Sequence, residues 1–264
     1  MSKVSRRRIH IAPVGFEIDR VVLPAKMDKA DKVYLMVHSD RKADQAKEYT
    51  AEIERRLNKG RPKIETEQVV ADLWNIEEIT RVTRDLILAN SDCNIAINLA
   101  SGSTNHSIGM DRACMTLRNR WNLRPFYPFA KTYNGFVYPH QQTEGVKKLK
   151  TIVAHRIQIP EDDLIQALKI IKQHQGRHGM KKKDLAKACH REHLIEYRGK
   201  SANAILIALD RQILQKLEHR WKAVRVEKPH NHHLVSLTEE GEWFEYILQN
   251  PEPTMTNLGT ASNT

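Results

Sequence analysis

Apolar and polar residues alternate in blocks along the first half of the chain, as strands and helices alternate in an α/β domain. The block Val33-Tyr34-Leu35-Met36-Val37 has no polar position, which is typical of a strand covered on both faces. Apolar residues recur at helical spacing between the strand-length blocks. The pattern predicts strands over 8–13, 32–38, 63–70, 94–100 and 125–131, and helices over 46–57, 76–87 and 104–120. Strands separated by such helices predict a Rossmann-like, mostly parallel sheet with right-handed crossovers.

Two features refine this first domain. Asn75 followed by Glu78 is a variant of the capping box, so the helix after it should begin at Asn75. The pattern becomes irregular over 132–159, where 133–135 and 139–142 indicate loops and 151–157 indicates a sixth strand.

The last third of the chain has a different pattern, of helices followed by a hairpin. Helices are predicted over 160–173 and 181–189, separated by a Gly-rich break at 176–179. A third begins with Ser201 as N-cap and buries the stripe Ala204, Ile205, Ala208, Leu209, Ile213 and Leu217. A hairpin over 223–228 and 232–237, turning at 229–231, precedes a final helix that starts at Thr238. We therefore predict domains over 1–155 and 156–250, and a disordered polar tail over 251–264.

Basic charge is concentrated in this last third. The chain carries a formal net charge of +11, and residues 151–235 hold 17 Lys and Arg against 9 Asp and Glu. Such a surplus favours polyanionic partners, because each phosphate that is neutralised releases a counterion.

Three helices, a hairpin and Leu-Thr-x-x-Gly opening a last helix resemble the winged helix-turn-helix of microbial transcription regulators. Such a module lays one helix in the major groove while its hairpin, the wing, reaches the backbone. We predict binding to double-stranded DNA through exposed residues of the second and third helices and the wing. These are Lys181, Lys182, Lys183, Lys200, Ser201, Asn203, Ile207, Arg211, Arg225, Lys228, His230, Asn231 and His232. A protein-docking winged helix is the alternative.

Other classes find little support in the sequence. No apolar run approaches the roughly 18 residues of a membrane-spanning helix, and no secretory signal is recognisable, so we expect a cytoplasmic protein without membrane partners. Cys93, Cys114 and Cys189 are too scattered for a disulfide framework. The motifs Cys189-His190-x-x-His193 and His230-x-His232-His233 do not complete a four-ligand zinc site. Neither G-x-G-x-x-G nor a phosphate loop is present, so we predict no metal and no cofactor.

The small, hydroxyl-rich segment Ala100-Ser101-Gly102-Ser103-Thr104-Asn105 follows the fourth strand and opens a helix. In an open parallel sheet, ligands bind beyond the carboxyl ends of the strands. A helix N-terminus there favours an anion. A capping turn without a ligand is the alternative.

Together with Val14-Gly15-Phe16-Glu17-Ile18-Asp19-Arg20 after the first strand and the C-terminal winged helix, this segment resembles archaeal CARF regulators, CRISPR-associated Rossmann-fold domains fused to winged helices. The resemblance covers about residues 8–248. It implies a homodimer that binds a cyclic oligoadenylate in a shared groove, lined here by Gly15, Phe16, Ser101, Gly102, Ser103, Thr104 and Asn105. Many relatives have a lysine after the turn's threonine, where this chain has Asn105-His106.

The sequence therefore predicts a ligand-responsive, DNA-binding transcriptional regulator. Two alternatives stay open. One is a ring nuclease that cleaves the cyclic nucleotide with Ser103, Thr104 and His106, the last as general base. The other is a DNA-binding protein that responds to no ligand, which a panel of nucleotides would distinguish by leaving its DNA affinity unchanged.

Overall fold

The computed structural model describes residues 6–40, 42, 44–117, 122–135, 140–152, 157–176, 178–197, 202–229 and 232–249. The chain forms two compact units, which divide between residues 157 and 158. Within these described ranges, no helix is both long and apolar enough to cross a membrane. The tail predicted to be disordered, 251–264, lies outside the described residues.

The first unit is built on a six-stranded sheet with the order β3-β2-β1-β4-β5-β6. The first five strands are parallel, and β6 pairs antiparallel with β5 at one edge. The strands are β1 (Arg8–Pro13), β2 (Lys32–His38), β3 (Glu65–Ala71), β4 (Asn94–Asn98), β5 (Leu123–Tyr133) and β6 (Thr143–Thr151). The predicted Rossmann-like, mostly parallel sheet is confirmed.

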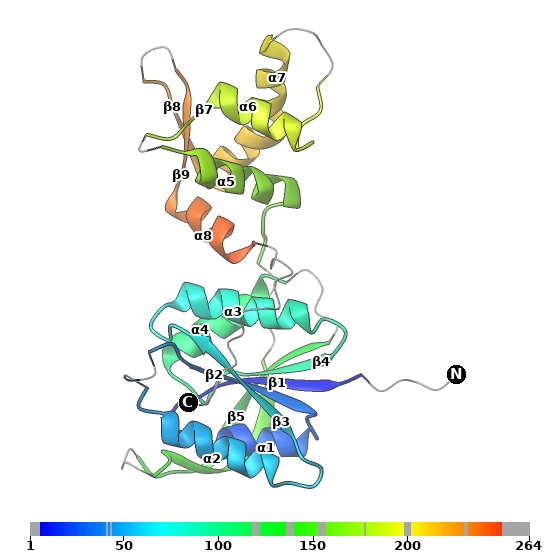
Figure 1. Ribbon diagram of the computed structural model, residues 1–264, viewed down its shortest axis with the longest axis vertical. Coiled ribbons are helices and arrows are strands. Elements are labelled where there is room, and N and C mark those ends of the chain that lie inside the picture. The colour runs from blue at the N-terminus through cyan, green and yellow to red at the C-terminus, as the bar shows by residue number, and fades with distance from the viewer. Residues whose placement is uncertain are drawn as a thin grey trace, which may run out of the picture. The chain divides into compact units, whose positions relative to one another are not determined.

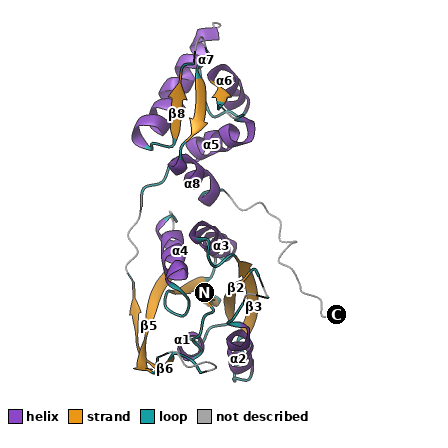
Figure 2. Ribbon diagram, turned by 90° about the vertical axis from the view of Figure 1, so that its left-hand side faces the viewer, coloured by secondary structure: helices purple, strands orange, loops and turns teal. Residues whose placement is uncertain are grey.

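Four helices connect these strands and cover both faces of the sheet. Helices α1 (Asp19–Met27) and α2 (Lys47–Asn58) lie on one face, and α3 (Ile76–Ala89) and α4 (Thr104–Met115) lie on the other (Figure 2). Strand β2 supplies both cores: Val33 and Leu35 pack in the core with α1 and α2, whereas Met36 packs in the core with α3 and α4. The all-apolar run of β2 is therefore buried from both sides, as its sequence predicted.

Several boundaries in this unit differ from those predicted. Helix α1 was not predicted, because Pro24 interrupts a short and weakly amphipathic segment. The sixth strand spans 143–151 instead of 151–157. Its side chains are largely exposed, so it lacks the apolar run that marks a buried strand. Helix α4 ends at Met115, before the predicted Arg120.

The second unit contains three helices around a small sheet, followed by a fourth helix (Figure 1). Helices α5 (Asp162–His174) and α6 (Lys182–Arg191) precede α7 (Ala202–Leu209). Two wider, π-type segments, 210–214 and 216–220, follow α7 directly. The sheet has the order β7-β9-β8, formed by β7 (Met180–Lys181), β8 (Val224–Glu227) and β9 (Leu234–Leu237). Helix α8 (Glu239–Ile247) closes the unit.

The apolar positions predicted for this unit form its core. Leu164, Leu168, Leu209, Ile213 and Leu217 are fully buried together. Helix α5 begins at Asp162 instead of Pro160, with Glu161 as its N-cap. The two-residue strand β7 was not predicted, because a pair of residues is too short to show a period. Strand β7 pairs with β9 of the hairpin, and the bond from the Lys182 amide to the His233 carbonyl, 2.9 Å long, continues this pairing into the start of α6.

Candidate functional site

The carboxyl ends of β1 and β4 lie side by side at the point where the strand order reverses. The two segments that follow them, 13–17 and 100–105, touch and are called the paired turns below. A Cβ atom on Gly15 would lie 2.8 Å from the carbonyl oxygen of Ser101, so only glycine allows this approach. The Ser101 hydroxyl donates to the carbonyl of Pro13 over 2.8 Å. The structure therefore brings together the two segments that sequence analysis singled out.

Gly102 sits at the centre of the paired turns, packed against protein atoms. A Cβ atom there would come within 2.7 Å of His106 Nδ1 and 2.8 Å of Pro13 Cβ. Its φ lies outside the left-handed region. Gly102 is thus needed for the packing of the turn itself, and a bulky substitution there would displace His106.

His106 caps the N-terminus of α4. Its Nδ1 accepts the N–H of Ser103 over 3.0 Å and lies 2.8 Å from the Ser103 hydroxyl. Burial, with a smaller contribution from the charge of His38, lowers the pKa of His106 to about 4. His106 is therefore neutral near pH 7 and a weak general base, and one of its two nitrogens is already committed to the cap.

The start of α4 presents polar groups to solvent. The side chains of Ser103 and Thr104 are exposed and Asn105 is partly exposed. The backbone N–H groups of Thr104 and Asn105 make no hydrogen bond within the part of the chain that the structure describes. Together with the helix dipole, these groups can hold an anion. Ser101 is 1% exposed, and its hydroxyl donates to the Pro13 carbonyl. Its role is therefore to fix the shape of the turn.

Phe16, which was predicted to line the ligand groove, packs against α2. Its ring meets that of Tyr49 edge-on, with centroids 5.4 Å apart. The following α1 N-terminus is already occupied, because Gln141 Oε1 accepts the N–H groups of Ile18 and Asp19. Of the two helices that the paired turns open, α4 is thus the one with open donors at its N-terminus.

Glu17 and Arg20 in the same motif are structural. Each is 5% exposed, and the Arg20 Nη1 lies 3.3 Å from Glu17. Thr143 donates to Glu17, and Arg20 Nε donates to the Pro128 carbonyl over 3.0 Å. These contacts tie the β5–β6 pair to the first paired turn.

Sequence analysis missed two aromatic residues near this edge. His38 ends β2, and its Nε2 is buried without a hydrogen bond among the described residues, as is Nε2 of His106. Trp74 follows β3 and is 76% exposed, with its ring edge-on to His38 at 6.2 Å. The sequence signal was a lone tryptophan directly after a strand. An exposed indole next to the carboxyl end of β2 offers a stacking surface for a nucleobase.

The second unit carries the predicted DNA-binding residues on its surface. On α7 and its extension, Asn203, Ile207 and Arg211 are exposed at successive turns, with Ile207 65% exposed. On the other elements, Lys181, Lys183, Arg225, Lys228 and His232 are exposed. The positions Lys200, Ser201, His230 and Asn231 lie outside the described residues.

Lys182 differs from its neighbours. Its Nζ lies 2.6 Å from Asp210, and only 16% of its side chain is exposed. This ion pair links the start of α6 to the helix that follows α7. Lys182 is therefore positioned to hold two helices together, whereas Lys183 and the nearby Lys187 face solvent.

Two family models match the chain. Residues 8–133 match the family described as HFX_2341_N:-like, N-terminal. Residues 163–247 match the DUF6293 C-terminal winged helix domain. The second unit is a winged helix domain.

One curated relative and two solved structures are similar to the chain. The uncharacterized protein MJ1513 of Methanocaldococcus jannaschii is 27% identical over 209 residues, which are 69% of this chain and 60% of that protein. Can2 from Sulfobacillus thermosulfidooxidans, solved with cyclic tetra-adenylate, shares 12% identity with a TM-score of 0.35 over 45% of this chain and 31% of its own. Enterococcus italicus Csm6, bound to cyclic hexa-2′-fluoro-hexa-dAMP, shares 11% identity with a TM-score of 0.36 over 47% of this chain and 34% of its own. The chain thus spans less than two thirds of each of these proteins.

The Leu-Thr-x-x-Gly motif of the winged helix domain has a clear structural role. Thr238 caps α8 by accepting the Gly241 N–H over 3.1 Å, and its own hydroxyl donates to the Lys222 carbonyl. A Cβ atom on Gly241 would lie 1.9 Å from the carbonyl oxygen of Ala223. The motif therefore seats α8 directly on the segment that leads into β8.

In the first of the two cysteine and histidine motifs, Cys189 and His190 pack against neighbouring residues, and His230 of the second motif lies outside the described residues. Cys189 is fully buried, and burial raises its pKa to about 12. The His190 ring stacks edge-on with Tyr197 at 4.9 Å. Across the described residues, no three His, Cys, Asp or Glu side chains gather as metal ligands would.

Proposed function

We propose that the protein is a ligand-responsive transcriptional regulator that binds double-stranded DNA as a homodimer. The observation that carries this proposal is a winged helix domain whose third helix presents Asn203, Ile207 and Arg211 to solvent. These side chain types match base edges in the major groove: an amide pairs with adenine, a guanidinium with guanine, and an apolar group with the thymine methyl.

The cations of the domain supply the part of the affinity that does not depend on sequence. Lys181 and Lys183 at the start of α6 and Arg225 and Lys228 on the wing bind phosphates on either side of the reading helix. Lys182 contributes indirectly, by holding α6 against the helix with Asp210.

The effector binds at the paired turns of the α/β domain. A cyclic oligoadenylate is the proposed ligand, and it rests on the resemblance of both turns to CARF regulators. The open donors at the α4 N-terminus suit a phosphate, and Trp74 offers a face on which an adenine can stack. Two copies of the turns face a shared groove in the dimer, so that one ligand reports to both winged helix domains.

We favour binding over catalysis at this site. The low pKa of His106 makes it a poor base at neutral pH, and its Nδ1 holds the cap of α4. A ring nuclease would need another base within reach of the ligand.

Fluorescence anisotropy with labelled duplex DNA over a range of salt concentrations tests the DNA assignment. The logarithm of the affinity should fall by about 0.9 per phosphate contact per log unit of salt. Lys183→Ala should weaken all sequences alike and reduce that slope by about 1. Lys172→Ala, on α5 and paired with Glu242, is the matched control and should leave the slope unchanged. A folded protein that shows no duplex binding at low salt contradicts the proposal.

Calorimetric titration with cyclic oligoadenylates of different ring sizes tests the effector. Thr104→Ala should cost on the order of 1–3 kcal/mol of binding, as expected for a hydroxyl that bonds a charged group. Ser91→Ala, beyond the far edge of the sheet, should bind like the wild type. Chromatography of the same mixtures detects linear products. Absence of binding for every ring rejects this ligand, and linear products would replace the proposal by the nuclease.

A further inference from the structure

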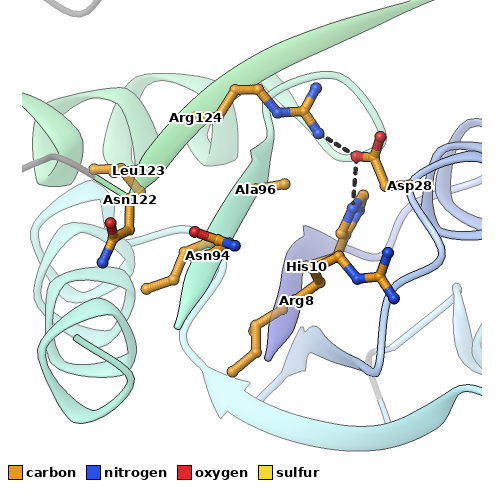
Figure 3. Close-up of a pocket in the computed structure, with 10 residues that line it drawn as sticks. Arg8, His10, Asp28, Asn94, Ala96, Asn122, Leu123 and Arg124 are labelled. Carbon is orange, nitrogen blue, oxygen red and sulfur yellow. Dashed lines mark hydrogen bonds and ion pairs between the residues drawn. The ribbon is translucent and has the colours of Figure 1, made fainter. Parts of the chain in front are cut away.

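A cavity lies at the edge of the sheet opposite the paired turns, where β1, β4 and β5 begin (Figure 3). Its volume is about 390 Å³, which falls within the roughly 300–1,000 Å³ of small-molecule pockets. The polar and charged side chains that line it are Arg8, His10, Asp28, Asn94, Asn122 and Arg124. Neither DNA binding nor the paired turns uses any of these residues.

The negative charge in this cavity is already compensated. Asp28 Oδ2 accepts a hydrogen bond from Arg124 and lies 2.9 Å from Nε2 of His10, which is 3% exposed (Figure 3). Burial alone would raise the pKa of Asp28, but the bond to His10 and the charges of His10 and Arg124 lower it. Asp28 is therefore an ionised carboxylate whose bonded oxygen is occupied by two donors.

Several N–H donors of the cavity remain available to a ligand. Only one nitrogen of Arg124 contacts Asp28, and its other two bond to no residue that the structure describes. Arg8 Nε is buried and lies 3.7 Å from Asp31, and it makes no hydrogen bond to any residue that the structure describes. The side-chain amide of Asn94 also has no partner within the described ranges. Asp31 pairs with Arg8 and Asp28 pairs with Arg124, so the charges of the two guanidinium groups are balanced. What the cavity holds in excess is N–H donors, on the two other nitrogens of Arg124 and on the Asn94 amide.

We propose that this cavity binds a small organic anion through its phosphate or carboxylate oxygens. Planar guanidinium groups pair with both kinds of oxygen through parallel N–H donors. Arg8 and Arg124 clamp the anionic group, the Asn94 amide donates a further bond, and Asp28 with His10 fixes the orientation of Arg124. The volume accommodates a nucleoside monophosphate or a tricarboxylate, but no long polymer.

The test is calorimetric titration of the full chain with three probes: inorganic phosphate, adenosine 5′-monophosphate and citrate. Arg8→Met and Arg124→Met should each lower the affinity at least tenfold for the probe that binds. Asp28→Asn should raise it, because the substitution removes the competing negative charge and retains an acceptor for His10. Arg112→Met, an exposed arginine on α4, is the control and should bind like the wild type.

The probes also distinguish the two ligand chemistries. Tighter binding of the monophosphate assigns a phosphate ligand, and tighter binding of citrate assigns a carboxylate. Circular dichroism of each variant shows that it has folded, and Arg8→Met serves if the loss of Arg124 unfolds the chain. No saturable binding of any probe at millimolar concentration overturns the proposal, as does equal binding by Arg8→Met and the wild type. DNA affinity is not part of the readout, so this result stands apart from the proposed regulator.

Discussion

Single residues set the geometry of both units, and glycines do so at points of contact between segments. Gly15 and Gly102 allow the paired turns to meet, and Gly241 allows α8 to lie on Ala223. None of the three has a left-handed φ, so each is there for space. The resemblance to CARF regulators implied that Gly102 lines the ligand groove, and in the structure the atoms nearest to its Cβ position belong to His106 and Pro13.

Gly241→Ala should destabilise the winged helix domain by about 1–3 kcal/mol, the usual cost of forcing extra atoms into a packed site. The added methyl would overlap the Ala223 carbonyl. Urea unfolding followed by tryptophan fluorescence measures it, since Trp221 and Trp243 lie in this domain. Gly176→Ala is the control, because its Cβ would meet no atom within 4 Å. Equal unfolding midpoints for the two variants would refute the steric argument.

His106 should make the α/β domain less stable as the pH falls. Its pKa is about 4 in the folded chain and near 6.5 when unfolded. The stabilisation is therefore present above pH 6.5 and is lost as the pH drops toward 4, by about 3 kcal/mol in all. In His106→Gln the side chain can still accept the Ser103 N–H but does not titrate.

Urea midpoints at pH 7, 6, 5 and 4 measure this difference. The wild type should lose stability more steeply than His106→Gln between pH 6.5 and 4. Carboxylates titrate in both proteins and cancel in the comparison. Parallel pH profiles would mean that His106 is not the titrating group.

At the scale of elements, the helix proposed to lie in the major groove, α7 with its extension, has an exposed face and a buried face. Asn203, Ile207 and Arg211 are exposed while Leu209, Ile213 and Leu217 fill the core. The core of the domain is thus built from the opposite face of the helix. Substitutions on the exposed face should change DNA recognition without unfolding the domain.

Ile207→Ala should relax base preference at one position by about 1–3 kcal/mol and leave the salt slope unchanged, because the side chain carries no charge. Asn203→Ala should relax preference at a neighbouring base pair. Selection from a randomised duplex library, followed by sequencing, measures both. A change in salt slope with retained base preference would place this face on the backbone instead of the bases.

The strands and helices that could be located from the sequence are those with an uninterrupted run or stripe of buried apolar residues. Strand β2 has the predicted bounds because polar residues, Lys32 and His38, flank its apolar run. Strand β1 has them because it begins at Arg8 and ends at Pro13, ahead of a glycine turn. The Asn75 cap is confirmed by its bond to the Glu78 N–H. Helix α1, strand β6 and strand β7 were missed or misplaced, since each is interrupted by proline, exposed or very short.

The candidate site was located only in part, and for a related reason. The paired turns could be found because each follows a strand and one opens a helix. His38 and Trp74 were missed, because they come from β2 and the segment after β3, and the sequence does not show that the strand order places β2 beside β1 and β3 beside β2. The cavity with Arg8 and Arg124 depends on the same order, which puts β1 and β5 on either side of β4.

At the scale of the whole molecule, regulation requires that the effector favour one arrangement of two reading helices. Helices that read successive major grooves lie about 34–36 Å apart, one turn of DNA. A coupling of about 1–3 kcal/mol between effector and DNA would change operator affinity roughly 5- to 150-fold.

The full chain should therefore sediment as a dimer at micromolar concentration, and so should a fragment of residues 1–157, which forms most of the first compact unit. Sedimentation velocity measures both. The fold change in DNA affinity should equal the fold change in effector affinity when DNA is bound, since coupling is reciprocal. A monomer at this concentration would contradict the proposal that two copies form a shared groove.

Strand β6 has a consequence for how the chain matures during synthesis. It pairs with β5 from the Tyr133 and Thr143 pair to the Phe126 and Thr151 pair. The two strands are therefore close in sequence, whereas each pair of neighbouring parallel strands is separated by a helical crossover. Hairpins of this kind close within microseconds, ahead of distant pairings. The exposed Lys147, Lys148 and Lys150 then make the new border of the sheet a poor template for a neighbouring chain. A nascent chain cut short before Thr143 leaves the β5 border bare and would accumulate as aggregates.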